Sequence, residues 1–192
     1  MKKMFSKIPC LNSDRITLRK LTLSDSDGLK DLVNSPAVYR YLPSYLYEKK
    51  YPDIQYVIEH LYDECLKESL ILGAFENNTF CGLAEIYGYR TAFHKVSVGY
   101  RLLERCWGRG IATNTLALMV DYLFNETDVK IITASTMIEN SASANVLRKN
   151  DFTMVLHGIP ENWGYSKPAI ADKWILRDHA GLWKNYKINQ FQ

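Results

Sequence analysis

The stretch Y-R-L-L-E-R-C-W-G-R-G-I-A-T, residues 100–113, decides the fold of this chain. Residues 95–102 form a strand-like run, and residues 114–124 place apolar side chains at helical spacing. Gly108 and Gly110 therefore stand where a strand gives way to a helix. Glycine lets the backbone approach a ligand closely, and the first turn of a helix has unpaired N–H groups at its positive end. The sequence thus predicts an anion site made of backbone.

The spacing of the glycines narrows the kind of anion site. A P-loop requires G-x-x-x-x-G-K-S/T, and a dinucleotide-binding fold requires G-x-G-x-x-G after a strand. Residues 108–112, Gly-Arg-Gly-Ile-Ala, fit neither pattern. We interpret the stretch as a cradle for a pyrophosphate. The alternative is an ordinary joint between a strand and a helix, with flexible glycines.

Residues 107–113 resemble the acyl-coenzyme A site of the GNAT acetyltransferases. The general signature of that family, Q/R-x-x-G-x-G/A, begins here at Trp107 and ends at Gly110, Ile111 and Ala112. Tryptophan departs from the general pattern. It is similar to the W-G-K/R-G-x-A-T run of the branch that contains the ribosomal-protein N-terminal acetyltransferases. The resemblance implies that the cradle holds the pyrophosphate of acetyl-coenzyme A.

Residues 140–152 resemble a second segment of the same branch, N-x-x-S-x-x-x-L-x-K-x-G-F. The matching residues are Asn140, Ser143, Leu147, Lys149 and Phe152. Asp151 replaces the usual glycine, and residues 150–151 can supply the left-handed stop of the preceding helix. Weaker matches at both ends extend the resemblance from Arg15 to Leu176.

The other segments supply the elements of one α/β domain. Strands are predicted at residues 15–21, 70–75, 79–87, 95–102, 129–136, 152–156 and 172–177. Helices are predicted after residues 24–27, from Pro52 onward, at 114–124 and at 140–149. Short turns make the three consecutive strands that end at residue 102 antiparallel. A helical crossover makes 129–136 parallel to 95–102, and 172–177 closes the sheet as a hairpin with 152–156.

The resemblance implies the GNAT fold for this α/β chain. We expect a mixed central sheet of six to seven strands, flanked by about four helices and splayed between the central strands. A chain of 192 residues suits a single domain, residues 1–192.

The resemblance also implies which residues hold the co-substrate, acetyl-coenzyme A. The cradle residues are Trp107, Gly108, Arg109, Gly110, Ile111, Ala112 and Thr113. The backbone of Tyr100, Arg101 and Leu102 would pair with the pantetheine arm like an added strand. Asn140 would hydrogen-bond the same arm, or else cap its helix. Arg105 and Arg109 either contact the adenosine phosphate or are solvated charges.

Acetyl transfer to an amine also needs a proton donor and a proton acceptor. Many GNAT enzymes place a donor tyrosine in the second segment, where this chain has Leu147. Ser143 is our candidate donor, directly or through water; the alternative is a small residue that merely lets the cofactor approach. The branch often has a glutamate where Ser97 stands, so Glu85 and Glu139 become the candidate bases, or else solvated carboxylates.

The predicted function is therefore an N-acetyltransferase that moves an acetyl group from acetyl-coenzyme A to a primary amine by direct attack. A protein N-terminal α-amine suits a weak base, because its pKa is about 8 against about 10.4 for lysine. One alternative is a small-molecule acetyltransferase acting on a polyamine, an amino acid or an aminoglycoside. Another is a non-catalytic coenzyme A-binding or sensing module. The tyrosine-rich residues 41–51 either line the substrate entrance or pack against the sheet.

Composition argues against other classes. A net charge of +3 without a basic run disfavours nucleic acid, and no apolar run approaches the roughly 20 residues of a membrane span. The cysteines and histidines offer no zinc spacing, so no metal is expected. The N-terminus lacks the apolar segment of a signal peptide. We expect a cytoplasmic monomer or homodimer, with Trp183 and Tyr186 as candidate dimer contacts and a frayed tail from Lys184.

Overall fold

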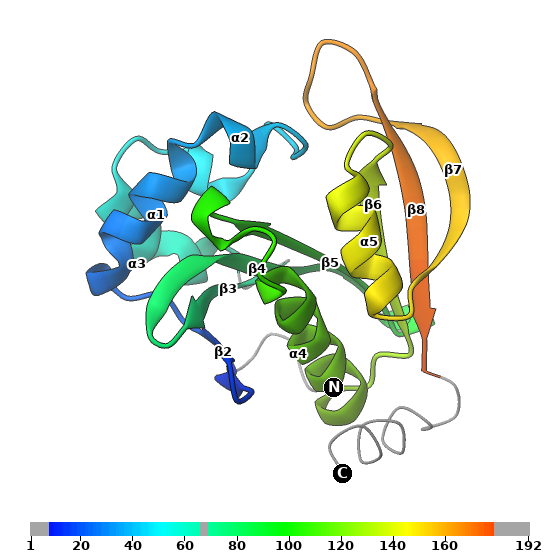
Figure 1. Cartoon of the computed structure of the whole chain (residues 1–192), viewed down its shortest axis with the longest axis horizontal. Helices are drawn as coiled ribbons and strands as arrows, with labels where there is room; N and C mark the ends of the chain where they lie inside the picture. Colours follow the sequence, from blue (N-terminus) through cyan, green and yellow to red (C-terminus); the bar gives the residue numbers. More distant parts are fainter. Residues whose placement is uncertain (1–7, 66–68, 179–192) are drawn as a thin grey trace.

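The fold of a computed structural model of this chain is a mixed β-sheet with helices on both faces (Figure 1). The structure describes residues 8–65 and 69–178, so the predictions for the N-terminal residues and for the tail with Trp183 and Tyr186 lie outside it. The strands are β1 (Leu11–Asn12), β2 (Ile16–Arg19), β3 (Ser69–Glu76), β4 (Thr79–Arg90), β5 (Lys95–Leu102), β6 (Ile131–Met137), β7 (Thr153–Glu161) and β8 (Ala169–Arg177). The helices are α1 (Ser26–Val33), α2 (Pro36–Tyr39), α3 (Ile54–Cys65), α4 (Ile111–Glu126) and α5 (Ser141–Lys149). The predicted α/β class with a mixed sheet is confirmed.

Two short elements correct the predicted numbers of strands and helices. Within the described residues the sheet has eight strands rather than six to seven, and there are five α-helices rather than about four. The extra strand, β1, has two residues, which is too short for polar and apolar side chains to alternate recognisably. The extra helix, α2, is a single turn that begins at Pro36, and the hydroxyl of Ser35 caps it by accepting the N–H of Val38.

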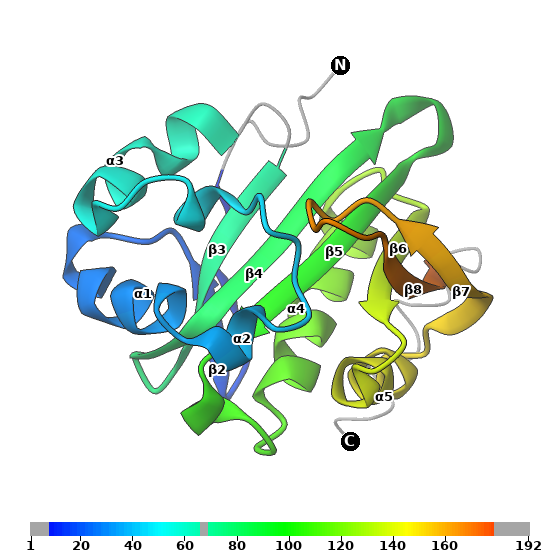
Figure 2. The same ribbon diagram turned by 90° about the horizontal axis from the view of Figure 1, so that it is seen from above.

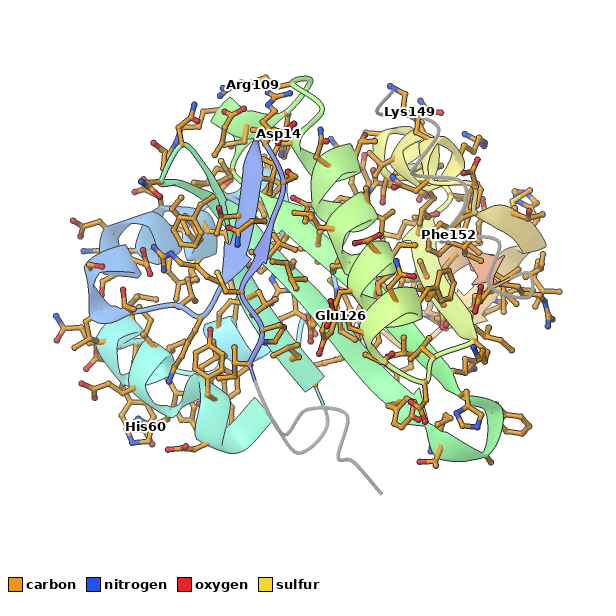
Figure 3. All side chains as sticks on the ribbon, turned by 90° about the horizontal axis from the view of Figure 1, so that it is seen from below. Asp14, His60, Arg109, Glu126, Lys149 and Phe152 are labelled. Atoms are coloured by element: carbon orange, nitrogen blue, oxygen red, sulfur yellow. The ribbon has the colours of Figure 1, made fainter. Side chains whose placement is uncertain are left out.

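The helices cover the sheet in two layers. In Figure 1, α1, α2 and α3 lie on one side of the central strands and α4 lies on the other. Figure 3, seen from below, shows α4 and α5 side by side on that second face. The predicted apolar stripe of α4 is confirmed, because Leu116, Met119, Val120 and Leu123 are all fully buried. Such burial supplies most of the stability of a helix in a folded protein.

The central strands β5 and β6 separate from each other after a few residues. They are parallel, as predicted, but only Lys95–Ser97 of β5 pair with Ile131–Thr133 of β6. Beyond Ser97 and Thr133 both strands continue without facing each other, β5 to Leu102 and β6 to Met137. We call the space between them the splay. The predicted separation of the central strands is thereby confirmed.

The last strand, β8, does not close the sheet at its edge as predicted. The sheet order is β1-β2-β3-β4-β5-β6-β8-β7, so β8 lies inside the sheet and β7 forms its edge. β7 and β8 do form an antiparallel pair, as predicted. The crossover from β6 through α5 returns β7 parallel to β6 but one strand away, and β8 fills that gap antiparallel to both.

Residues with positive φ end several elements where the sequence indicated turns. Asn77 and Asn78 have φ of 49° and 61°, which closes the hairpin between β3 and β4. Asp151, with φ of 63°, ends α5 in the left-handed conformation that glycine usually supplies. Both turn predictions are confirmed.

We predict that Gly82→Ala destabilises the protein. A Cβ at Gly82 would overlap the carbonyl oxygen of Arg101 on the neighbouring strand β5, and backbone cannot yield as a side-chain tip can. Overpacking of this kind costs about 1–3 kcal/mol, so urea unfolding should show a loss in that range. The matched control is Gly99→Ala on β5, whose Cβ would meet its nearest neighbour at 3.7 Å. Equal stability of the two variants would contradict the prediction.

Candidate functional site

A cavity of about 670 Å³ passes through the splay. Its lining begins at the N-terminus of α4, continues between β5 and α5, and ends under two loops on the opposite face of the sheet. These loops are residues 41–46, before α3, and residues 161–163, at the end of β7, which we call the roof. Figure 2 shows the segment after α2 passing over β4 and β5 toward the loop between β7 and β8. The N–H of Ser44 donates to the carbonyl oxygen of Trp163 across the roof, at 2.8 Å.

The first end of the cavity is the predicted cradle. Gly108 and Gly110 have φ of 69° and 77°, a conformation that favours glycine. Gly110 is the N-cap residue of α4, and no side chain caps this helix end. Gly108 and Gly110 line the cavity together with Ile111, Ala112 and Thr113. The first-turn N–H groups of α4 have no partner within the helix, and they lie at the positive end of its dipole. The helix begins three residues earlier than predicted, so the cradle is its first turn.

The arginines near the cradle lie beside the cavity. Arg109 is absent from the cavity lining, and its guanidinium pairs with Glu76. The same carboxylate accepts a hydrogen bond from Nε of Arg15 at 2.6 Å. A Cβ on Gly110 would lie 3.7 Å from the Arg15 guanidinium, so Arg15 stands next to the cradle. Figure 3 shows Arg109 and Asp14 at this end of the molecule. Sequence reasoning missed Arg15, because only folding brings β2 to the start of α4.

Two predicted cradle neighbours have local roles. Trp107 lines the cavity, and its indole N–H donates to the carbonyl oxygen of Leu102 at 2.8 Å. This bond ties the loop back to the end of β5. Arg105 forms an exposed ion pair with Asp31 at 3.2 Å and is not part of the lining. Such an exposed pair contributes little to stability.

The start of α5 forms the wall of the splay opposite β5. Asn140 caps α5, because its side-chain oxygen accepts the N–H of Ser143 at 3.1 Å. The capping role considered for Asn140 is therefore present, although Asn140 also lines the cavity. The hydroxyl of Ser143 is hydrogen-bonded to the phenol oxygen of Tyr100 at 3.0 Å. Leu147, one turn further along α5, is buried and also lines the cavity.

The opposite face of β5 carries a buried ion network. The guanidinium of Arg101 donates to Glu48 at 2.7 Å and to Glu85 at 2.8 Å, and the phenol of Tyr39 donates to Glu48 at 2.9 Å. Burial by itself would lower the pKa of Arg101, but the two carboxylates outweigh it and raise that pKa above its usual value. Two carboxylates against one guanidinium leave one excess negative charge. Glu85 lines the cavity, so this charge faces the second end of the cavity.

The roof is aromatic. Tyr41, Tyr45 and Trp163 line the cavity from above, and Tyr87 of β4 lines it from below. Burial raises the pKa of Tyr87, and the nearby carboxylates of Glu85 and Glu161 raise it further. Burial also raises the pKa of Tyr45, and the carboxylates of Glu161 and Glu85 raise it further. The phenols of Tyr45 and Tyr87 therefore stay neutral throughout the ordinary pH range.

The tyrosine-rich stretch divides between the cavity and the core. Tyr41 and Tyr45 line the cavity. Tyr47 and Tyr51 are absent from its lining and pack against the hydrophobic core.

The two candidate bases occupy different environments. Glu85 faces the cavity and is held by Arg101. Glu139 is exposed in the turn before α5 and does not belong to the lining. Ser97, which stands where the branch often has a glutamate, is hydrogen-bonded to Thr133 at 3.0 Å across the last paired position of β5 and β6. The structure therefore brings Glu85, and not Glu139, to the cavity.

Nowhere in residues 8–65 and 69–178 do three side chains of the His, Cys, Asp or Glu types gather as a metal site would require. No helix in this part of the chain has the length and apolar character needed to cross a membrane.

Comparisons with known proteins agree with this arrangement. The family described as "Acetyltransferase (GNAT) domain" matches residues 15–153. An uncharacterised N-acetyltransferase from Bacillus licheniformis is 24% identical over 177 residues, which cover 89% of this chain and 98% of the relative. The ribosomal-protein α-N-acetyltransferase RimL, solved with coenzyme A, has a TM-score of 0.77 at 18% identity, covering 90% of this chain and 99% of RimL.

A spermidine N-acetyltransferase from Vibrio cholerae, solved with coenzyme A and spermine, has a TM-score of 0.68 at 16% identity. The alignment covers 86% of this chain and 96% of that protein. The chain belongs to the GNAT acetyltransferases, and it is an acetyltransferase that uses acetyl-coenzyme A.

We predict that Arg101→Met destabilises the protein by about 3–5 kcal/mol, because Glu48 would then be a buried carboxylate without its cation. Urea unfolding measures the loss. The double variant Arg101→Met with Glu48→Gln should recover part of it, since the uncompensated charge is gone. A double variant that is less stable than Arg101→Met alone would show that the charge is not the cause.

Proposed function

We propose that acetyl-coenzyme A enters the cavity from the α4 end and that a primary amine enters under the roof. The observation that carries this proposal is the charge arrangement along one continuous cavity. The uncapped N-terminus of α4 lies at one end, and the excess negative charge at Glu85 lies at the other. The first end suits a diphosphate and the second suits an ammonium group.

The cradle amides from Gly108 to Thr113 are the proposed pyrophosphate site. Backbone N–H groups there require no side-chain rearrangement to accept an anion. The stretch of β5 from Tyr100 to Leu102 pairs with β4 on one side and has no strand partner toward β6, so on that side it offers N–H and C=O groups to the amides of the pantetheine arm, as a neighbouring strand would. Asn140 lines the same part of the cavity, where its amide NH₂ group can donate to the arm while its oxygen caps α5.

The proposed reaction is direct attack of the neutral amine on the thioester carbonyl. A carbon–nitrogen bond forms, the carbon–sulfur bond breaks, and the sulfur leaves with the electron pair. Ser143 supplies a proton to that sulfur, directly or through water, and regains one from the solvent. The positive end of the α5 dipole lies at Ser143 and stabilises the developing negative charge. The proton lost by the amine passes toward Glu85, directly or through water.

The proposed acceptor is the α-amine of a peptide or protein. About a tenth of such amines are already neutral near pH 7, so a distant carboxylate suffices as the base. The resemblance of the fold to RimL supports this choice. A polyamine or another small amine is the second candidate, which the excess negative charge at Glu85 favours, as does the resemblance to a spermidine N-acetyltransferase.

The proposal is tested by measuring thiol release from acetyl-coenzyme A in the presence of peptides, polyamines, amino acids and aminoglycosides. We expect turnover with peptides. The cradle is tested with Gly110→Val, because a β-branched residue at φ of 77° distorts the first turn of α4. The KM for acetyl-coenzyme A should rise at least about tenfold, the value of a 1.4 kcal/mol loss.

Gly88→Val is the matched control, since Gly88 has φ of 64° but lies outside the cavity lining. It should lose a similar amount of stability and keep its KM. Binding of coenzyme A without turnover of any amine would favour a sensing module. An unchanged KM in Gly110→Val would place the pyrophosphate elsewhere.

We predict that Glu85→Gln lowers kcat/KM for the amine by about tenfold near pH 7, because only about a tenth of α-amines are neutral there without a base. The deficit should shrink above pH 9, where the amine is neutral without help. Arg101 keeps Glu48 as its partner in this variant, so the fold should persist. Glu139→Gln is measured beside it. A larger loss of kcat/KM in Glu139→Gln than in Glu85→Gln would indicate that Glu139, and not Glu85, is the base.

A further inference from the structure

The phenol of Tyr100 crosses the splay to reach α5. Tyr100 belongs to β5, five residues after Lys95, and its neighbours Arg101 and Gly99 face the other side of the sheet. Its hydroxyl lies 3.0 Å from the hydroxyl of Ser143. Both residues line the cavity. The contact joins two elements 43 residues apart in sequence, at the place where Ser143 is proposed to meet the leaving sulfur.

The direction of this hydrogen bond determines what Ser143 can donate. Each hydroxyl has a single hydrogen and can either donate it to the other or point it elsewhere. A phenol is the more acidic of the two groups and is therefore the better donor. Burial raises the pKa of Tyr100 to about 12, so the phenol keeps its hydrogen at any pH at which the protein would be assayed. Among the described residues, Ser143 is the hydrogen-bond partner that Tyr100 has.

We propose that Tyr100 is a positioning residue for acetyl transfer, which donates its hydroxyl hydrogen to Ser143 and so directs the hydrogen of Ser143 toward the leaving sulfur. This inference rests on the proposed function. Ser143 regains a proton from solvent water as it gives one up, so Tyr100 keeps its own proton in the step. The carbon–sulfur bond breaks with its electron pair going to sulfur, and the hydrogen that meets the sulfur comes from Ser143 or from a water bound to it.

One further contact holds Ser143 in place. Its backbone N–H is held by the side chain of Asn140, which fixes the first turn of α5. A helical serine often bonds the carbonyl oxygen one turn earlier, but the hydroxyl of Ser143 instead has Tyr100 as its partner within the described chain. Leu147 lies one turn further on the same side of α5 and adds no polar group. The phenol beside Ser143 thus comes from Tyr100 of β5, because α5 has Leu147 and no tyrosine there.

The test is a double-mutant cycle with Tyr100→Phe, Ser143→Ala and the double variant. Tyr100→Phe keeps the ring and removes the hydroxyl. We expect kcat to fall about fivefold to tenfold, the effect of one hydrogen bond, while the KM for acetyl-coenzyme A stays within about twofold. In the Ser143→Ala background the same substitution should have no further effect, because Tyr100 acts through Ser143.

The matched control is Tyr89→Phe, which also removes a phenol on a strand. The hydroxyl of Tyr89 donates to Asp128 at 2.8 Å, outside the cavity lining. This variant should keep its kcat. Thermal unfolding and binding of coenzyme A to each variant verify that the fold and the cofactor site remain.

Additive losses in the double variant would overturn the inference, because Tyr100 would then act independently of Ser143. An unchanged kcat in Tyr100→Phe would overturn it as well. A wild-type protein that transfers no acetyl group to any amine would instead refute the proposed function. In that case the cycle could still be read in acetyl-coenzyme A hydrolysis, where the same dependence on Ser143 is expected.

Discussion

The separation of β5 from β6 after Ser97 and Thr133 is the constraint on which the site depends. Parallel strands normally exchange hydrogen bonds along their whole length, and buried backbone groups without partners are costly. Here the sheet keeps its backbone groups open to a cavity of about 670 Å³. Neighbouring elements prevent collapse of this opening: Tyr100 spans it to α5, and β8 pairs with β6 from the far side. The cavity is therefore a product of sheet topology rather than of a loop on the surface.

Electrostatics divides that cavity into two unlike halves. The positive dipole ends of α4 and α5 lie at the half proposed for the cofactor, and the N-terminus of α4 has no side-chain cap there. The other half carries the buried network of Arg101, Glu48 and Glu85, with one excess negative charge. Because successive residues of a strand face opposite sides, Tyr100 and Arg101 serve different halves although they are adjacent in sequence. One strand thus separates the two proposed substrates.

The sequence predicts best what depends on the local backbone. The cradle is recognisable because glycine spacing and a following helix are read from consecutive residues, and the strands are recognisable from their alternation. β1 and α2 are missed because two and four residues carry no period. The site is predicted less fully. The side-chain contacts of Tyr100 with Ser143 and of Arg101 with Glu48 are not anticipated, because they join residues 43 and 53 apart. Only the folded topology brings such partners together.

The salt bridge between Arg101 and Glu48 has a consequence for how amine preference can change among related proteins. Glu48 follows the roof segment of residues 41–46, and its salt bridge with Arg101 attaches that segment to β5 in the middle of the sheet. Residues between α2 and Glu48, such as the largely exposed Tyr45, can be exchanged without breaking the salt bridge between Arg101 and Glu48. Under the proposed function, acceptor selectivity can therefore change through replacements in the roof, while the main-chain groups proposed to hold the acyl donor stay the same.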